Sequence, residues 1–77
     1  MSVKVHYFAS LRERVGCAEE SLDLQPGATV RDAWDRGCAG FPIPQNTLCA
    51  LNEEYTSLDA NLSDGDRVAF FPPVTGG

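Results

Sequence analysis

The strongest constraint on the fold is an alternation of apolar and polar residues in two segments, 3–8 near the start of the chain and 67–71 near its end. A period of two residues is typical of a β-strand that buries one face. In the first segment, one face would carry Val3, Val5 and Tyr7, and the other would carry Lys4, His6 and Phe8. In the second, one face would carry Val68 and Phe70, and the other Ala69 and Phe71. We therefore expect a sheet with one buried face.

Two helices are expected between these strands. Ser10 and Glu13 have the spacing of a capping box, and Gly16 is suited to end the short helix that follows them. The second and main helix begins with Thr29 as its N-cap and Asp32 in its first turn. Its apolar stripe consists of Val30, Ala33, Trp34 and Cys38, and the glycines at 37 and 40 would end it early.

Three further strands complete the pattern. Segment 20–25 alternates, with Leu22 and Leu24 inward; segment 48–52 follows the main helix; and a tight turn at 52–55 leads into a short fourth strand. One helix across a sheet of such strands is an α+β arrangement, and we expect the ubiquitin-like β-grasp, a mixed sheet whose first and last strands are parallel neighbours. The β-grasp domain would span residues 1–71, followed by an extended C-terminal tail at 72–77.

The composition of the chain narrows the range of partners to be expected. The chain has 11 acidic and 6 basic residues, a net charge of −5, and its only lysine is Lys4. Without a basic run, nucleic acid is not an expected partner, and a basic protein surface is a better match. No apolar stretch is long enough to span a membrane, no secretory signal is recognisable, and the three cysteines form no Cys-x-x-Cys pair. We expect a cytoplasmic protein with no metal site.

The last six residues, PPVTGG, have a composition of their own. Pro72 and Pro73 favour an extended backbone, Val74 and Thr75 are β-branched, and Gly76 and Gly77 carry no side chain. Fully extended, six residues reach about 20 Å. We expect a stiff tail whose terminal carboxylate can enter a narrow site in another protein. That carboxylate is inert until activated, and the chain has no phosphate-binding loop, so any ATP would be bound by a partner.

Three stretches carry a resemblance to a known family: VHYFASLRERVG (5–16), ALNEEY (50–55) and LSDGDRVAFFPPVTGG (62–77). In these, the chain resembles the small subunits of molybdopterin synthase, a family of ubiquitin-like sulfur carriers. It departs from them at 35–47, where the helix and loop are shorter and richer in proline.

The resemblance implies a sulfur-transfer role. An activating enzyme would adenylate Gly77 with its own ATP, and a sulfur donor would convert the adenylate to a thiocarboxylate. The large synthase subunit would then use this sulfur to build the molybdopterin dithiolene from a cyclic pyranopterin. The chain would be a subunit of an enzyme, with no cofactor of its own and no independent catalysis.

The face opposite the helix is the expected docking surface. If the end strands pair, Phe8 and Phe71 come close there, and Tyr55 would join them. The partners would be the activating enzyme and the large subunit in turn, which would also contact residues 72–75. The alternative is that these rings form a second buried layer beneath a loop.

Other residues have structural interpretations. His6 is expected on the surface, and Trp34, Cys38 and Cys49 in the core, while Cys17 is the cysteine expected to be exposed. The acidic pairs at 19–20 and 53–54 are expected to be solvated.

Three other functions stay open at this point: a sulfur carrier for thiamine synthesis, a ubiquitin-like protein modifier, and a plain interaction domain. Against the modifier stands Thr75, because ubiquitin-type tails carry arginine before the two glycines.

Overall fold

The computed structural model describes residues 1–37 and 39–73. Its elements are β1 (Ser2–Tyr7), α1 (Ala9–Val15), β2 (Glu19–Asp23), α2 (Val30–Arg36), β3 (Leu48–Leu51), β4 (Glu54–Thr56) and β5 (Arg67–Phe71). The order of strands and helices matches the sequence prediction. The predicted stripe residue Cys38 lies outside the described residues.

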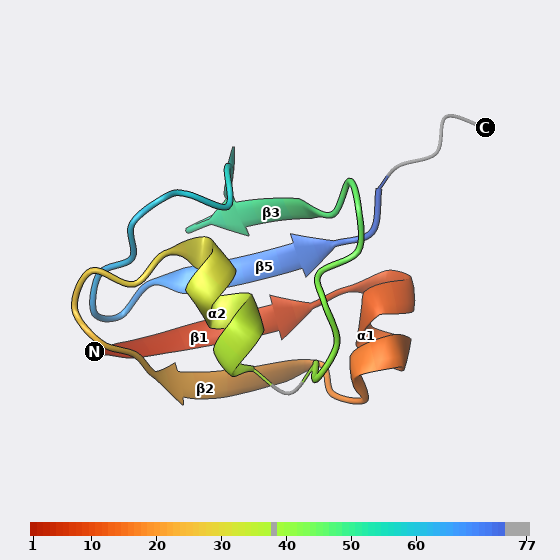
Figure 1. Ribbon diagram of the computed structural model, residues 1–77, viewed down its shortest axis with the longest axis horizontal. Helices are drawn as coiled ribbons and strands as arrows, with labels where there is room; N and C mark the ends of the chain where they lie inside the picture. Colours follow the sequence, from red (N-terminus) through yellow and green to blue (C-terminus); the bar gives the residue numbers. More distant parts are fainter. Residues whose placement is uncertain (38, 74–77) are drawn as a thin grey trace.

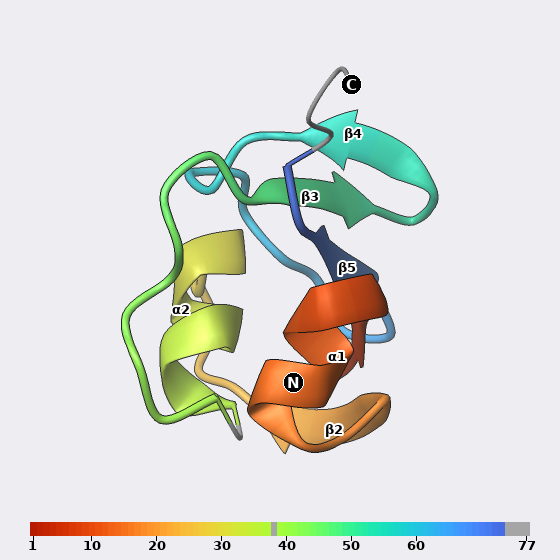
Figure 2. The same cartoon turned by 90° about the vertical axis from the view of Figure 1, so that its right-hand side faces the viewer.

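The strands form one five-stranded sheet in the order β2-β1-β5-β3-β4. β1 and β5 are parallel neighbours at its centre, with Val5 beside Val68 and Tyr7 beside Phe70, and the other pairings are antiparallel. α2 lies across one face of this sheet (Figure 1), and the view turned by 90° places it to one side of the strands (Figure 2). The predicted mixed sheet of the β-grasp, with its end strands paired, is therefore confirmed.

The core lies between α2 and the sheet. Val3, Val5 and Tyr7 of β1 and Val68 and Phe70 of β5 are all buried there, as their alternation predicted. Trp34 of α2 is also buried, and its ring meets that of Phe70 edge-on with 5.0 Å between centroids. Its indole N–H donates to the carbonyl of Phe41 at 2.9 Å, which ties the loop after α2 to the helix.

The two helices begin differently. Thr29 caps α2 as predicted, in a full capping box with Asp32, and Gly37 ends that helix. The predicted cap at Ser10 is wrong: α1 begins at Ala9, Phe8 is its N-cap, and Ser10 lies inside the first turn. The reason is that the Phe8 N–H donates to the Phe70 carbonyl at 3.1 Å, so β-sheet hydrogen bonding continues to the residue directly before the helix. Gly16 ends α1 in the left-handed conformation at φ 89°, as predicted.

The prediction that both acidic residues of β2 are solvated is wrong for one of them. Glu20 is half-buried, and its carboxylate accepts a hydrogen bond of 2.6 Å from the hydroxyl of buried Tyr7. Tyr7 points into the core with its hydroxyl toward β2, and the carboxylate satisfies that polar end.

None of the helices within the described ranges is long and apolar enough to cross a membrane.

Candidate docking surface beside the C-terminal tail

The register of the two central strands brings Phe8 and Phe71 together. Tyr7 and Phe70 are partners in the parallel ladder and point into the core, so the residues that follow them point to the opposite face. The rings of Phe8 and Phe71 stack there, with centroids 4.7 Å apart and planes inclined by 9°. This is the geometry expected from the sequence, since Phe8 directly follows β1, Phe71 ends β5, and both continue the outward positions of the alternation.

Tyr55 joins the pair from the edge of the sheet. It is the ladder partner of Ala50 on β3, and its ring centroid lies 6.1 Å from that of Phe71. Phe8 is 44% exposed, Tyr55 is 74% exposed and Phe71 is half-buried. The aromatic cluster, which we define as Phe8, Tyr55 and Phe71, therefore lies at the surface. Within the part of the chain that the structure describes, the alternative prediction that these rings form a second buried layer is wrong.

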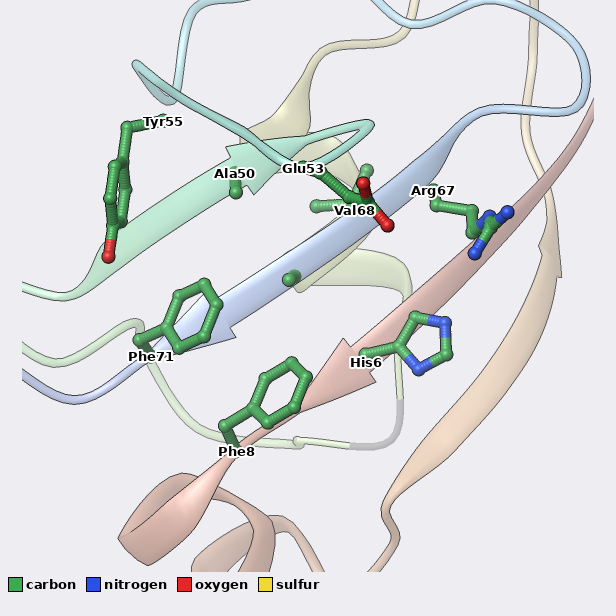
Figure 3. Close-up of a pocket in the computed structure, with 9 residues that line it drawn as sticks. His6, Phe8, Ala50, Glu53, Tyr55, Arg67, Val68 and Phe71 are labelled. Carbon is green, nitrogen blue, oxygen red and sulfur yellow. The ribbon is translucent and has the colours of Figure 1, made fainter.

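A groove of about 380 Å³ runs beside the aromatic cluster on this face (Figure 3). Its floor is formed by Ala50 and Ala69, ladder partners on β3 and β5, and its polar rim by His6, Glu53 and Arg67. The small floor residues leave the larger rings standing above the sheet. An apolar centre with a polar rim is typical of a surface that binds another protein.

His6 has more contacts than the sequence suggested. Its Nδ1 lies 3.4 Å from a carboxylate oxygen of Glu19, and its ring stacks on Phe8 with 6.4 Å between centroids. His6 therefore lies within the groove and forms part of the candidate surface. The signal in the sequence was its position two residues before Phe8 on the same face of the strand.

Cys49 offers no activated thiol. Cys49 is buried, its thiol donates to the carbonyl of Thr56 at 3.3 Å, and burial raises its pKa. A thiol that is harder to ionise is a poorer nucleophile, so Cys49 is a core residue, as predicted. Cys17 is half-buried rather than fully exposed. In the part of the chain that the structure describes, no group of three His, Cys, Asp or Glu residues could hold a metal ion.

The tail leaves the sheet beside the aromatic cluster. β5 ends at Phe71, Pro72 is half-buried and Pro73 is exposed, so the chain leaves the ladder where the two prolines were expected to end it. The remaining predicted site residues, Val74, Thr75, Gly76 and Gly77, lie outside the described residues. Whatever partner takes in the tail would thus approach the cluster as well.

Fold and surface together define a small β-grasp protein with an exposed apolar face next to the origin of its C-terminal tail. The chain belongs to the ThiS family, whose model matches residues 5–77. The match covers all of the described sheet except the first residues of β1, and it includes the tail.

Two proteins of known function are similar to this chain over nearly their whole length. The molybdopterin synthase sulfur carrier subunit of Haemophilus influenzae is 50% identical over 84 residues, and that of Escherichia coli is 39% identical over 84 residues. In each case the match covers 97% of this chain and 99% of the relative.

Solved structures support the same fold. Haloferax volcanii SAMP1, a small archaeal modifier protein, superposes with a TM-score of 0.81 at 30% identity, over 100% of both chains. A putative molybdopterin converting factor subunit 1 from Pyrococcus furiosus gives a TM-score of 0.74 at 35% identity, over 96% of this chain and 99% of that one. In the Amycolatopsis orientalis BexX/CysO complex, one chain matches at 27% identity with a TM-score of 0.63, over 97% of this chain and 99% of that one.

Proposed function

We propose that this chain is the sulfur carrier subunit of molybdopterin synthase, and that Gly77 carries the sulfur. The observation that carries the proposal is the similarity to sulfur carrier subunits along 97% of the chain, at up to 50% identity. The exposed aromatic cluster beside the start of the tail supports it, because a carrier must dock on each partner while its terminus enters that partner's active site.

The proposed chemistry takes place at the Gly77 carboxylate. A partner enzyme binds ATP and joins AMP to the carboxylate, with release of pyrophosphate. Sulfide from a donor then attacks the acyl carbon, AMP leaves with the electron pair of the broken bond, and the terminus becomes a thiocarboxylate. This sulfur is a stronger nucleophile than the carboxylate oxygen, and a closed pocket in the next partner would protect it from hydrolysis.

The large subunit would hold the cyclic pyranopterin and take up the charged tail. The thiocarboxylate sulfur bonds to a carbon of the pterin side chain in place of an oxygen substituent, and water then cleaves the bond between this sulfur and the Gly77 acyl carbon, which returns the carboxylate. Each transfer supplies one sulfur, so the two sulfurs of the dithiolene require two transfers. The role of this chain is to position the sulfur: the stretch 72–75 sets the reach of the terminus, and Gly76 and Gly77 pass where a side chain would not fit.

We propose that the aromatic cluster is the docking site for both partners. Phe8 and Phe71 form a preordered apolar platform, since the stacked rings are held by the two central strands. Burying this platform would supply the apolar centre of the interface. Because the same platform serves both, the activating enzyme must leave before the large subunit can bind.

A second function, protein modification, is favoured by one observation, the superposition on a small archaeal modifier protein. Both functions begin with an adenylated terminus and differ in the acceptor: sulfur in a carrier, and the amine of a target lysine in a modifier. The Thr75 that precedes the glycines, where ubiquitin-type tails carry arginine, favours the carrier.

The test is reconstitution of the synthase with purified activating enzyme, sulfur donor, large subunit and precursor, with the dithiolene product measured. Deleting Gly77, or adding one alanine after it, moves the carboxylate by up to about 3.3–3.6 Å. A displacement of about 1 Å can already lower the rate of a positioned reaction about a hundredfold. Both variants should fold and dock but make no product, and product formed at the wild-type rate without Gly77 would refute the mechanism.

A further inference from the structure

A like-charged pair lies on the two central strands at one end of the sheet's open face. Lys4 of β1 and Arg67 of β5 are ladder partners in the parallel register, on strands about 4.8 Å apart. Lys4 alternates with the buried Val3 and Val5, so it points to the same face as His6 and Phe8, and both cations line one shallow hollow of about 510 Å³. Like charges on adjacent ladder positions repel each other and destabilise a sheet.

Within the described residues, neither Lys4 nor Arg67 forms an ion pair. The ion pairs there join the N-terminus to Asp23 and His6 to Glu19. Lys4 has the neutral Ser21 as its partner on β2. The open face of the sheet thus holds two cations side by side, in a chain that has almost twice as many acidic as basic residues.

Two acidic residues, Glu19 and Asp66, line the same hollow, but their carboxylates contact other groups, that of Glu19 lying 3.4 Å from Nδ1 of His6. The Asp66 carboxylate accepts from the Asn52 side chain at 3.0 Å and the Ser63 N–H at 2.7 Å, and Asp64 accepts from the Ser2 N–H at 2.6 Å. Glu53 lines the groove with Arg67 but forms no ion pair with it. The carboxylates in the hollow offset part of the repulsion, but within the described residues neither Lys4 nor Arg67 is directly paired with an acid.

The position of Lys4 and Arg67 on the open face indicates which group would pair with them. The pair lies about 13 Å along the strands from the stacked phenylalanines, at four residues of about 3.3 Å each. His6 and Ala69 lie between them and line the groove beside the aromatic cluster. A partner that covers the cluster and extends along the central strands would reach Lys4 and Arg67.

We propose that Lys4 and Arg67 are the charged end of the docking face, and that the large synthase subunit places a carboxylate between them. The inference rests on the function proposed above. The aromatic cluster supplies affinity at one end, and the carboxylate at the other end fixes the rotation of this chain about the cluster. Fixing that rotation aims the tail, because complementary charges set the register and the association rate more than the affinity.

The experiment compares the double variant Lys4→Gln/Arg67→Gln with Arg31→Gln/Arg36→Gln. Arg31 and Arg36 lie exposed on α2, across the sheet, so the control makes the same change in net charge. The association rate and Kd for the purified large subunit are measured at about 50 and 300 mM salt, a range over which surface charges become screened. The same binding is measured for the activating enzyme.

We expect the Lys4/Arg67 variant to bind the large subunit about tenfold more weakly at low salt, through slower association, and to lose most of the salt dependence. The α2 control should stay within about twofold of wild type. Because the variant relieves repulsion, its thermal unfolding midpoint should equal or exceed that of wild type, whereas a structural role for the pair would lower it.

Three results would overturn the proposal: an unchanged Kd and salt slope, an equal effect of the α2 control, or a weakening confined to the activating enzyme. These outcomes are distinct from failure of the proposed function, in which wild-type protein would not bind the large subunit at all.

Discussion

Replacing Phe71 with alanine separates the docking role of the aromatic cluster from a structural one. The ring stacks on Phe8 at 4.7 Å and lies 6.1 Å from the ring of Tyr55, on the face away from the core. The neighbouring Phe70 points the other way and is fully buried. Adjacent phenylalanines on one strand thus serve opposite faces of the sheet, and the truncation should affect one face only.

The structure sets the size of the two effects. Losing the stacked pair should lower the free energy of unfolding by about 0.5–1.5 kcal/mol, whereas truncating buried Phe70 would cost about 3–5 kcal/mol. In binding, Phe71 lies at the centre of the proposed interface, where truncations of anchor residues cost at least about 1 kcal/mol. That loss corresponds to about a fivefold increase in the Kd for the large subunit.

Titration calorimetry with the large subunit gives the Kd, and urea unfolding followed by circular dichroism gives the stability. The matched control is Phe41→Ala. Phe41 also contacts another aromatic ring, that of Trp34 at 5.6 Å, but on the helix side of the sheet. The control should lose stability and keep its affinity.

An unchanged Kd for a folded Phe71→Ala variant would refute the docking role. If that variant fails to fold, Phe71 belongs to the core instead, and Phe8→Ala, which truncates the exposed partner of the stack, then decides whether the cluster contributes to binding.

Three further predictions concern the fold. Gly37→Ala should lower stability by about 1–3 kcal/mol in urea unfolding, because a Cβ there would clash with the Tyr7 hydroxyl; an unchanged midpoint would contradict this packing. Thr29→Ala should remove the capping box with Asp32 and cost about 1 kcal/mol by the same assay, and a change below about 0.3 kcal/mol would argue against the cap. Because burial raises the pKa of Cys49 above its ordinary value of 9.0, the folded state favours the neutral thiol. Stability should therefore fall as the pH rises through 9.0, and less so in Cys49→Ala; equal pH profiles would contradict the assignment.

The sequence predicted the sheet because its strands bury one face. Alternation in residues 3–8 and 67–71 identified the buried set, and burying both sets under one helix leaves the end strands as neighbours. The same alternation placed Phe8 and Phe71 on the open face. These features follow from a local period, which the sequence displays directly.

Features that depend on tertiary contacts could not be predicted in this way. Ser10 has the right spacing for a cap, but the Phe8 N–H is held by the carbonyl of Phe70, sixty-two residues away, and this contact fixes where the helix begins. Glu20 looks like any surface acid until Tyr7 is placed beside it. The adjacency of Lys4 and Arg67 likewise appears only once the register of β1 against β5 is known.

The central claim, that Gly77 carries sulfur, is tested most directly by the intact mass of the protein. The chain is incubated with ATP, an activating enzyme and a sulfur donor, and its intact mass is then measured by mass spectrometry under non-reducing conditions. Exchange of one oxygen for sulfur adds about 16 daltons, and the variant lacking Gly77 should show no gain. A wild-type mass that stays unchanged, or that shifts only to adducts the size of whole proteins joined through lysine, would contradict the account.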